Sequence, residues 1–548
     1  MSTPPPGPAT ATEDGSADPQ APDAFEDGYE GYADGEFPGD EDAEDREGPR
    51  AVLPPVRLAP EAELAAAALS APVFARAVRL ARWADPERPV GPAGELGDAD
   101  LAEAAALLEL PAEDPDTPAY AGEAWRVAVD AGLVEVTEPE EAEETGGVAR
   151  PGPELPSVLG GAPRDVLDLW LAALDTVVAD AAVPDLDDLV DALDEGGEID
   201  FERLGWDPRR EQEFLEGVLG NLYLLTVAEG GSGETPVPLP VLAASAVIPD
   251  GMEEPTEEVL EEVSEAMMRL DDQFRQLAGI GLVDFRPVDE ALMAEATDEE
   301  LAAGSPSDAE LDDEDIARYG IVRLTPLGLY GVRSLLVEAG VDAPAVGDLA
   351  EEHARVLLEV VPHYPDAAAD AEIDHWLAAR PAPTAAAELL DAARGTDPAG
   401  PLRRLAAQRA LGRLGTGADG TAETELVAAV RAGADEGESA GVARVWLAER
   451  GVDDLPPPSP ELVLWLAVDT LSAHLAAVDP EEPEADGQGP VALLVELIAR
   501  NPGFLDEAWR VRHPDAAAVL EAIGRLHPDR ATAKEARKAA FKARSRRD

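Results

Sequence analysis

Cysteine is absent from this chain of 548 residues, and its only lysines are Lys534, Lys538 and Lys542, close to the C-terminal end. Without a thiol the protein forms no disulfide, no iron–sulfur cluster, no cysteine zinc site and no thiolate nucleophile. The position of the lysines leaves none for a phosphate-binding loop or a Schiff base in the rest of the chain. These two absences exclude many classes of enzyme.

Basic residues are also few, because 41 Lys and Arg stand against 115 Asp and Glu, a formal net charge of −74. A polyanion repels phosphate, so nucleic acid and membranes are not expected as default partners. The chain shows no basic leader and no uncharged apolar run of about 18 residues, which predicts a cytoplasmic protein without a membrane span. Apolar residues still make up 45% of the chain, which is enough to build hydrophobic cores.

Residues 1–50 contain no Leu, Ile or Val, and they carry 15 acidic residues against two arginines. Such a segment cannot bury enough apolar surface to offset the entropy of ordering, so we expect a disordered acidic tail. Its four aromatic residues are candidates for docking in a basic, apolar groove of a partner: Phe25, Tyr29, Tyr32 and Phe37. The alternative is a solvated tail that only keeps the protein soluble.

Residues 51–160 show the order of elements of a winged-helix unit. The expected elements are helices over 72–84 and 101–110, a third helix ending at Asp130, and strands over 133–136 and 147–150. Apolar residues with a period of 3.6 line one side of the first helix, and Asp98 and Asp100 are expected to cap the second.

The end of this unit recurs 149 residues further along the chain. Trp125-Arg126 and Gly132-Leu-Val-Glu-Val136 align with Phe274-Arg275 and Gly281-Leu-Val-Asp-Phe285. The glycine suits a helix C-terminus with positive φ. We therefore expect a second winged-helix-like unit over 236–345 with a long acidic wing, a return strand over 321–324, Thr325 as N-cap and Pro326 at the first helical position.

The rest of the chain is expected to be helical. Residues 161–235 hold two amphipathic helices, over 166–178 and 210–225, that are expected to bridge the units. The pattern of residues 346–529 predicts a HEAT-like array of short helices, in which each helix buries its apolar face only against its neighbours. Its expected helices cover 401–414, 423–431, 441–449, 462–478 and 491–500, and residues 530–548 are expected to form a basic helical tail.

Two degenerate winged-helix units, an alanine-rich helical region and the ending HPDRATAKEARKAAFKARSRR resemble a group of uncharacterised proteins of high-GC actinobacteria. The resemblance covers most of residues 55–548. It implies the same fold and no particular activity.

The segments that would approach DNA in these units are acidic. Residues 91–125 hold nine acids and no base, residues 251–273 hold nine acids and one base, and residues 287–315 hold twelve acids and no base. Because DNA-reading helices need Arg or Lys, these units are expected to serve as protein-interaction modules. The alternative is a DNA-binding transcriptional regulator that uses the arginines of 76–82 and the terminal helix.

Three motifs match a catalytic or ligand-binding pattern without its structural context. Ser439 lies in a G-x-S-x-G sequence, but no strand is expected before it, so it reads as a helix cap and a serine hydrolase is a distant alternative. The G-x-G-x-x-G at 415–420 follows a helix, whereas a nucleotide-binding loop follows a strand. The six histidines include no i, i+4 pair. We expect no catalytic residue, no cofactor and no metal.

The few clusters of positive charge are the candidate sites for an anion or a partner. They comprise Arg76, Arg79 and Arg82; Arg403, Arg404, Arg409 and Arg413; and Lys534, Arg537, Lys538, Lys542, Arg544, Arg546 and Arg547. Ala536, Ala539 and Ala543 are expected on the opposite side of the terminal helix. Three explanations stay open: the bases complement helix dipoles, they pair with acids of the same chain, or they bind an external anion.

The sequence thus predicts a mainly α protein with two winged-helix-like units followed by a HEAT-like array and flanked by charged ends. It predicts a non-enzymatic protein that binds an unknown protein partner or regulates one, with nucleic acid a disfavoured partner and no membrane contact.

Overall fold

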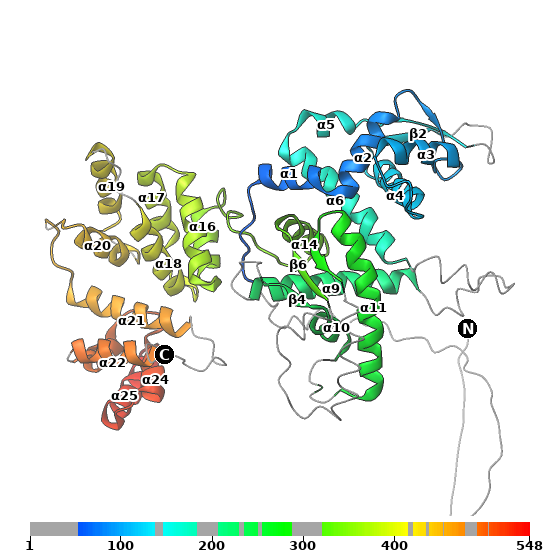
Figure 1. The fold of residues 1–548 in the computed structure, drawn as a ribbon. Helices are drawn as coiled ribbons and strands as arrows, with labels where there is room; N and C mark the ends of the chain where they lie inside the picture. The colour runs from blue at the N-terminus through cyan, green and yellow to red at the C-terminus, as the bar shows by residue number, and fades with distance from the viewer. Residues whose placement is uncertain are drawn as a thin grey trace, which may run out of the picture. The chain divides into compact units, whose positions relative to one another are not determined.

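The structure is a computed structural model that describes residues 53–137, 146–183, 207–228, 235–249, 252, 255–287, 320–414, 420–434, 438–452, 454–476, 490–501 and 503–547, without the side chains of 420–422, 490–493 and 547. These residues are mainly helical, with two antiparallel sheets of three strands each (Figure 1). The mainly α class is therefore confirmed. The predicted tail with Phe25, Tyr29, Tyr32 and Phe37 lies outside the described residues.

Four helices accompany the first sheet in the chain. Its elements are α1 (Glu61–Ser70), α2 (Pro72–Trp83), β1 (Arg88–Pro89), α3 (Asp98–Leu107), α4 (Thr117–Asp130), β2 (Val134–Thr137) and β3 (Val148–Pro151). The strands lie in the order β1-β3-β2. Phe74, Ala77 and Ala81 of α2 are fully buried, as the helical period predicts.

A second sheet repeats this arrangement. Its elements are α9 (Pro208–Ala228), β4 (Val237–Pro238), α10 (Leu239–Val247), α11 (Glu257–Gly279), β5 (Val283–Arg286) and β6 (Ile321–Leu324), with the order β4-β6-β5. β1 and β4, the ends of α4 and α11, and the starts of β2 and β5 are each 149 residues apart. The repeat found in the sequence is therefore a repeat of structure in this part of the chain.

Two glycines and a threonine stabilise the connections between helices and strands in the two repeats. Gly132 and Gly281 have φ of +72° and +81°, which the predicted helix ends require. Thr325 caps α14 (Pro326–Glu338) by accepting a hydrogen bond from the Gly328 amide at 2.8 Å, as predicted. Its hydroxyl also donates to the Gly281 carbonyl at 2.6 Å, so one side chain joins the second sheet to the helix that follows.

Some expected details are wrong. Gly97, not an aspartate, precedes α3, and Asp98 and Asp100 lie inside its first turn, where they complement the helix dipole. β1 and β4 were not expected, because two residues are too short to show an alternating pattern. The expected bridging helix over 210–225 is α9, which packs on α10 and α14 beside the second sheet.

One hydrophobic cluster runs from Leu53 to Ala345 and contains both sheets. The remaining helices of this part are α5 (Leu155–Gly160) and α6 (Pro163–Ala181). α6 contacts α1 and α4 as well as α11, and its buried Trp170 donates to the Ile280 carbonyl at 3.0 Å. The described residues from Leu53 to Ala345 thus share a single core, and α6 contacts both repeats, as expected of a bridging helix.

From α14 onward the described elements are helices. They are α15 (Ala354–Val360), η3 (Val361–His363), α16 (Asp366–Ala378), α17 (Ala382–Ala392), α18 (Gly400–Arg413), α19 (Gly420–Ala432), α20 (Ala440–Glu449), α21 (Pro460–Ala476), α22 (Pro490–Arg500), α23 (Phe504–Glu507), η4 (Ala508–Arg510), α24 (Ala516–Leu526) and α25 (Arg530–Arg547). They form two hydrophobic clusters, from Ala354 to Leu447 and from Val468 to Ala543. The expected basic tail is therefore a folded helix, α25, packed on α24.

The contact between α14 and α6 gives a stability prediction. A Cβ on Gly331 would lie 2.7 Å from Trp170 Cη2 and 2.9 Å from Leu174 Cδ2, whereas a Cβ on Gly217 of α9 meets nothing within 4 Å. We expect Gly331→Ala to lower the free energy of unfolding by about 1–3 kcal/mol through overpacking. Gly217→Ala, the matched control, should raise it by up to about 1 kcal/mol through helix propensity. Urea unfolding of both variants checks this, and equal effects would contradict the packing.

Candidate functional site

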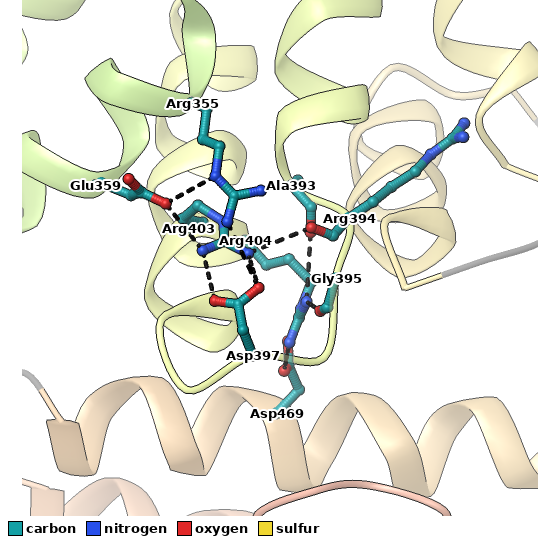
Figure 2. A network of polar contacts seen from close by, with 9 residues as sticks. All are labelled: Arg355, Glu359, Ala393, Arg394, Gly395, Asp397, Arg403, Arg404 and Asp469. Atoms are coloured by element: carbon teal, nitrogen blue, oxygen red, sulfur yellow. Dashed lines mark hydrogen bonds and ion pairs between the residues drawn. The ribbon is translucent and has the colours of Figure 1, made fainter.

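The arginines of α18 are the first candidate cluster, and two of them point into the structure. The side chain of Arg403 is fully buried and that of Arg404 is 2% exposed. Arg403 donates to both carboxylate oxygens of Asp397, at 2.7 and 2.6 Å, and to Glu359 at 3.1 Å (Figure 2). Arg355 also donates to Glu359, at 3.0 Å. An external anion therefore has no access to Arg403, which is neutralised by carboxylates of the chain itself.

Arg404 joins the two helical clusters. It forms a bidentate pair with Asp469 of α21, with distances of 2.8 and 2.5 Å, and donates to the Gly395 carbonyl at 2.8 Å (Figure 2). The Nδ1 atom of buried His513 accepts from the Asp515 amide, so its Nε2 donates to Asp469 at 3.0 Å. Burial opposes the charge of Asp469, but the hydrogen bonds from Arg404 and His513 outweigh it and lower the pKa.

Arg409 and Arg413 are bound to the same face of α16. Arg409 donates to Asp370 at 2.6 Å and Asp366 at 2.8 Å, and Arg413 donates to Asp374 at 2.7 Å. The three aspartates recur every fourth residue, so they form one row opposite the arginines. All four candidate arginines of α18 thus pair with acids of the same chain, which is one of the three explanations that the sequence left open for them.

The arginines of α2 differ in the contacts that they make with the rest of the chain. Arg79 donates to the Leu107 carbonyl, and Arg82 is exposed. Arg76 faces Glu123 of α4, whose pKa is raised by burial and by Asp180 and is lowered in part by Arg76. Arg79 thus connects α2 to α3, while the use of this row as an anion site stays a prediction.

The basic residues of α25 face solvent. The alanines at 536, 539 and 543 are buried against α24, which confirms their expected position, while Lys534, Arg537, Lys538, Lys542, Arg544 and Arg546 are exposed. Three of them have partners within the chain: Arg537 donates to the Gly524 carbonyl at 2.9 Å, Arg544 pairs with Glu521 at 2.9 Å, and Arg546 donates to the Arg510 carbonyl. The side chain of Arg547 lies outside the described residues.

The exposed face of α11 has the opposite charge. The helix carries seven acidic residues and two arginines, and Arg269 and Arg275 pair with Glu211 at 2.9 Å and Asp271 at 2.6 Å. Two large apolar side chains stand among the acids, Met268 at 66% and Leu260 at 53% exposure. Sequence analysis missed both, although Met268 lies opposite the buried stripe of Leu270, Phe274 and Leu277 on a helical wheel.

The two catalytic or ligand-binding patterns, at Ser439 and at residues 415–420, each follow a helix and not a strand. In the described residues 420–434 and 438–449, Ser439 stands between the helices α19 and α20, so no strand leads into it. It precedes α20 without the expected capping bond, and its buried hydroxyl has no hydrogen-bond partner among described atoms. Residues 415–419 of the glycine-rich motif lie outside the described residues, and the element before them is the helix α18.

Neither a metal cluster nor a membrane-spanning helix is found in the described part of the chain. No group of three or more His, Asp or Glu there could hold a metal ion. No single described helix is long and apolar enough to cross a bilayer. The helices α1 and α2 have the required length and composition only when taken together, and the chain bends by 74° between them.

No family model, curated protein or solved structure matches the chain.

The Arg404–Asp469 pair yields a second prediction. Asp469→Ala leaves a guanidinium buried without its counter-ion, so we expect the free energy of unfolding to fall by about 3–5 kcal/mol. The double variant Arg404→Met, Asp469→Leu should recover most of this loss. Arg413→Met, which breaks a partly exposed pair, should cost at most about 1 kcal/mol. Urea unfolding separates these outcomes, and an Asp469→Ala protein as stable as Arg413→Met would contradict the buried role.

The Asp397 carboxyl predicts a dependence on pH. Hydrogen bonds from Arg403 hold its pKa well below the usual range, although burial opposes them. Because the folded pKa is lowered, the stabilisation is complete above the unfolded pKa of about 3.9 and is lost as the pH falls through the folded value. We expect Asp397→Asn to be less stable at pH 7 and to approach the parent protein below about pH 4. Unfolding measured from pH 7 to pH 3 checks this, and parallel stability curves would refute it.

Proposed function

We propose that the protein is a non-enzymatic protein–protein interaction or regulatory protein that uses winged-helix-like units as docking modules. The order helix, strand, helix, helix, hairpin in both repeats, with the return strand central in each sheet, supports the winged-helix assignment. The succession of short helices from α15 to α24, each packed on near neighbours, supports a HEAT-like array.

The acidic, partly apolar face of α11 carries the proposal. In a winged helix that reads DNA, the helix before the hairpin enters the major groove and supplies cations to phosphates and base edges. α11 holds that position, and both of its arginines are paired with acids of the chain. Its outer face would repel a phosphate backbone, so a basic polypeptide is the partner that its charge favours.

Met268 gives this surface an apolar centre. Glu261, Glu265 and Asp272 lie seven and three residues before it and four residues after it, so on a helix all three are its neighbours along one side. A large apolar side chain inside a polar rim is the arrangement of an interface hot spot. The proposed partner surface thus combines an apolar pocket for Met268 with a basic rim.

We expect Met268→Arg in the full-length protein to lower recovery of a specific partner from cells by at least about tenfold, because the new cation repels a basic surface. Val337→Arg is the matched control, since Val337 is 49% exposed on α14 and should tolerate the charge. Affinity purification with quantitative mass spectrometry measures both. A photoreactive residue at 268 should also crosslink to that same protein, and one at 337 should not.

A duplex-binding measurement can overturn the proposal. In a variant with Lys534, Lys538 and Lys542 changed to alanine, the full chain should not bind a 30-base-pair duplex at physiological salt. If it does bind, the proposal is overturned in favour of the alternative, a DNA-binding regulator, and the effect of Met268→Glu then shows whether α11 or the arginines of 76–82 contact the duplex.

A further inference from the structure

The outward side of α25 carries a row of cations. Arg530, Lys534, Lys538, Lys542 and Arg546 recur every fourth residue and all are exposed. Residues at this spacing follow one ridge of a helix, with about 6 Å of rise between successive charges. The buried alanines fix this orientation, because Ala533, Ala536, Ala539, Ala540 and Ala543 occupy the opposite side. We name these five cations the α25 ridge.

An aromatic side chain stands beside the ridge in solvent. Phe541 is 68% exposed, the highest exposure among the large apolar residues described. On the helical wheel it lies between Arg537 and Lys538, within the cationic face. A bare aromatic ring among cations has no role in the packing of α25 on α24, but it offers a face on which a planar group can stack.

A cavity adjoins the C-terminal end of the ridge. It has a volume of about 350 Å³, and its lining includes Thr396, Trp509, Arg512, Ala543 and Arg546 and no carboxylate. Trp509 also makes two cation–π contacts: Arg510 Cζ lies 4.6 Å and Lys542 Nζ 5.2 Å from the centroid of its ring. Arg512 and Arg546 both line the cavity. Arg546 donates one hydrogen bond to the Arg510 carbonyl, and its other N–H groups, with those of Arg512, suit a phosphate, which arginine binds in a bidentate manner.

We propose that α25 binds single-stranded nucleic acid, with phosphates along the α25 ridge, an unpaired base stacked on Phe541, and a further phosphate held by Arg512 and Arg546 at the cavity. Backbone neutralisation by a row of cations together with base stacking on aromatic rings is the chemistry of sequence-tolerant strand binding. An exposed ring requires unpaired bases, because the bases of a duplex are stacked on one another. An acidic polypeptide would use the cations and leave Phe541 without a function.

The charge of the rest of the chain does not prevent this. Interactions between exposed charges are largely screened beyond about 8 Å at physiological ionic strength. Of the acids close to the ridge, Glu521 is paired with Arg544, and Asp529 accepts hydrogen bonds from the amide and hydroxyl of Thr532. Glu535 is exposed on α25 itself, next to Lys534, so the helix has one acid among its cations and keeps a net positive charge. The proposal concerns α25 alone and is independent of the partner surface on α11.

The test is fluorescence anisotropy of the full-length protein with a labelled 20-nucleotide oligothymidine and its uridine counterpart, from 50 to 200 mM salt. Changing Lys534, Lys538 and Lys542 to alanine should weaken binding and lower the slope of log K against log salt by about 2, at 0.7 for each lost phosphate contact. Phe541→Ala should raise the Kd about 5- to 100-fold. Alanine favours helix, so both variants keep α25 folded, which circular dichroism verifies.

A control variant removes the same charge elsewhere. Arg209, Arg394 and Arg500 are exposed surface arginines, and changing them to alanine should leave binding and its salt slope unchanged. Absence of binding at 50 mM salt, or equal losses in the lysine and arginine variants, overturns the proposal. Equal competition by polyglutamate, with no effect of Phe541→Ala, also overturns it and assigns the ridge to an acidic polypeptide.

Discussion

The buried pairing of arginine with carboxylate is the interaction on which the C-terminal half of the protein depends. Arg404 and Asp469 connect α18 with α21, and Arg403 fastens the turn before α18 to α15. A buried ion pair repays its desolvation only when geometry and further hydrogen bonds are good, and here backbone carbonyls and His513 supply those bonds. Gly395, with φ of +117°, lets the turn approach, because a Cβ there would lie 2.8 Å from Asp397 Oδ2.

This use of arginine shapes the surface. In a chain with 115 acids and 41 bases, each buried ion pair removes one acid and one base from the surface, so the excess of acids outside is unchanged and few bases are left there. On α11 the two arginines are paired, and the exposed face keeps an acidic character around Met268. On α25 the alanine face packs inward, so the cations of the ridge stay in solvent. The two faces therefore differ in sign and in the partners that they can attract, a basic polypeptide for one and a polyanion for the other.

Elements with a strong local pattern could be predicted from sequence. The helix ending at Asp130, the hairpin strands, the cap at Thr325 and the buried alanines of α25 all follow from periodicity, turn chemistry or capping within a few residues. The strands β1 and β4 could not, because two residues carry no period and are defined only by pairing with β3 and β6. The row of aspartates on α16 was a missed indication, since its four-residue spacing matches Arg409 and Arg413.

The sequence by itself determined the helices, the repeat at 149 residues and the places where positive charge is concentrated, because these depend on neighbours along the chain. Only the tertiary structure decided what those charges do. The partner of Arg404 is 65 residues away, and those of Arg409 and Arg413 are about 40 residues away, on other helices. A cluster of arginines therefore looks the same in sequence whether it faces water or carboxylates. Packing makes the α18 arginines internal and leaves the α25 ridge exposed, because acids meet the first from neighbouring helices and few acids lie beside the second.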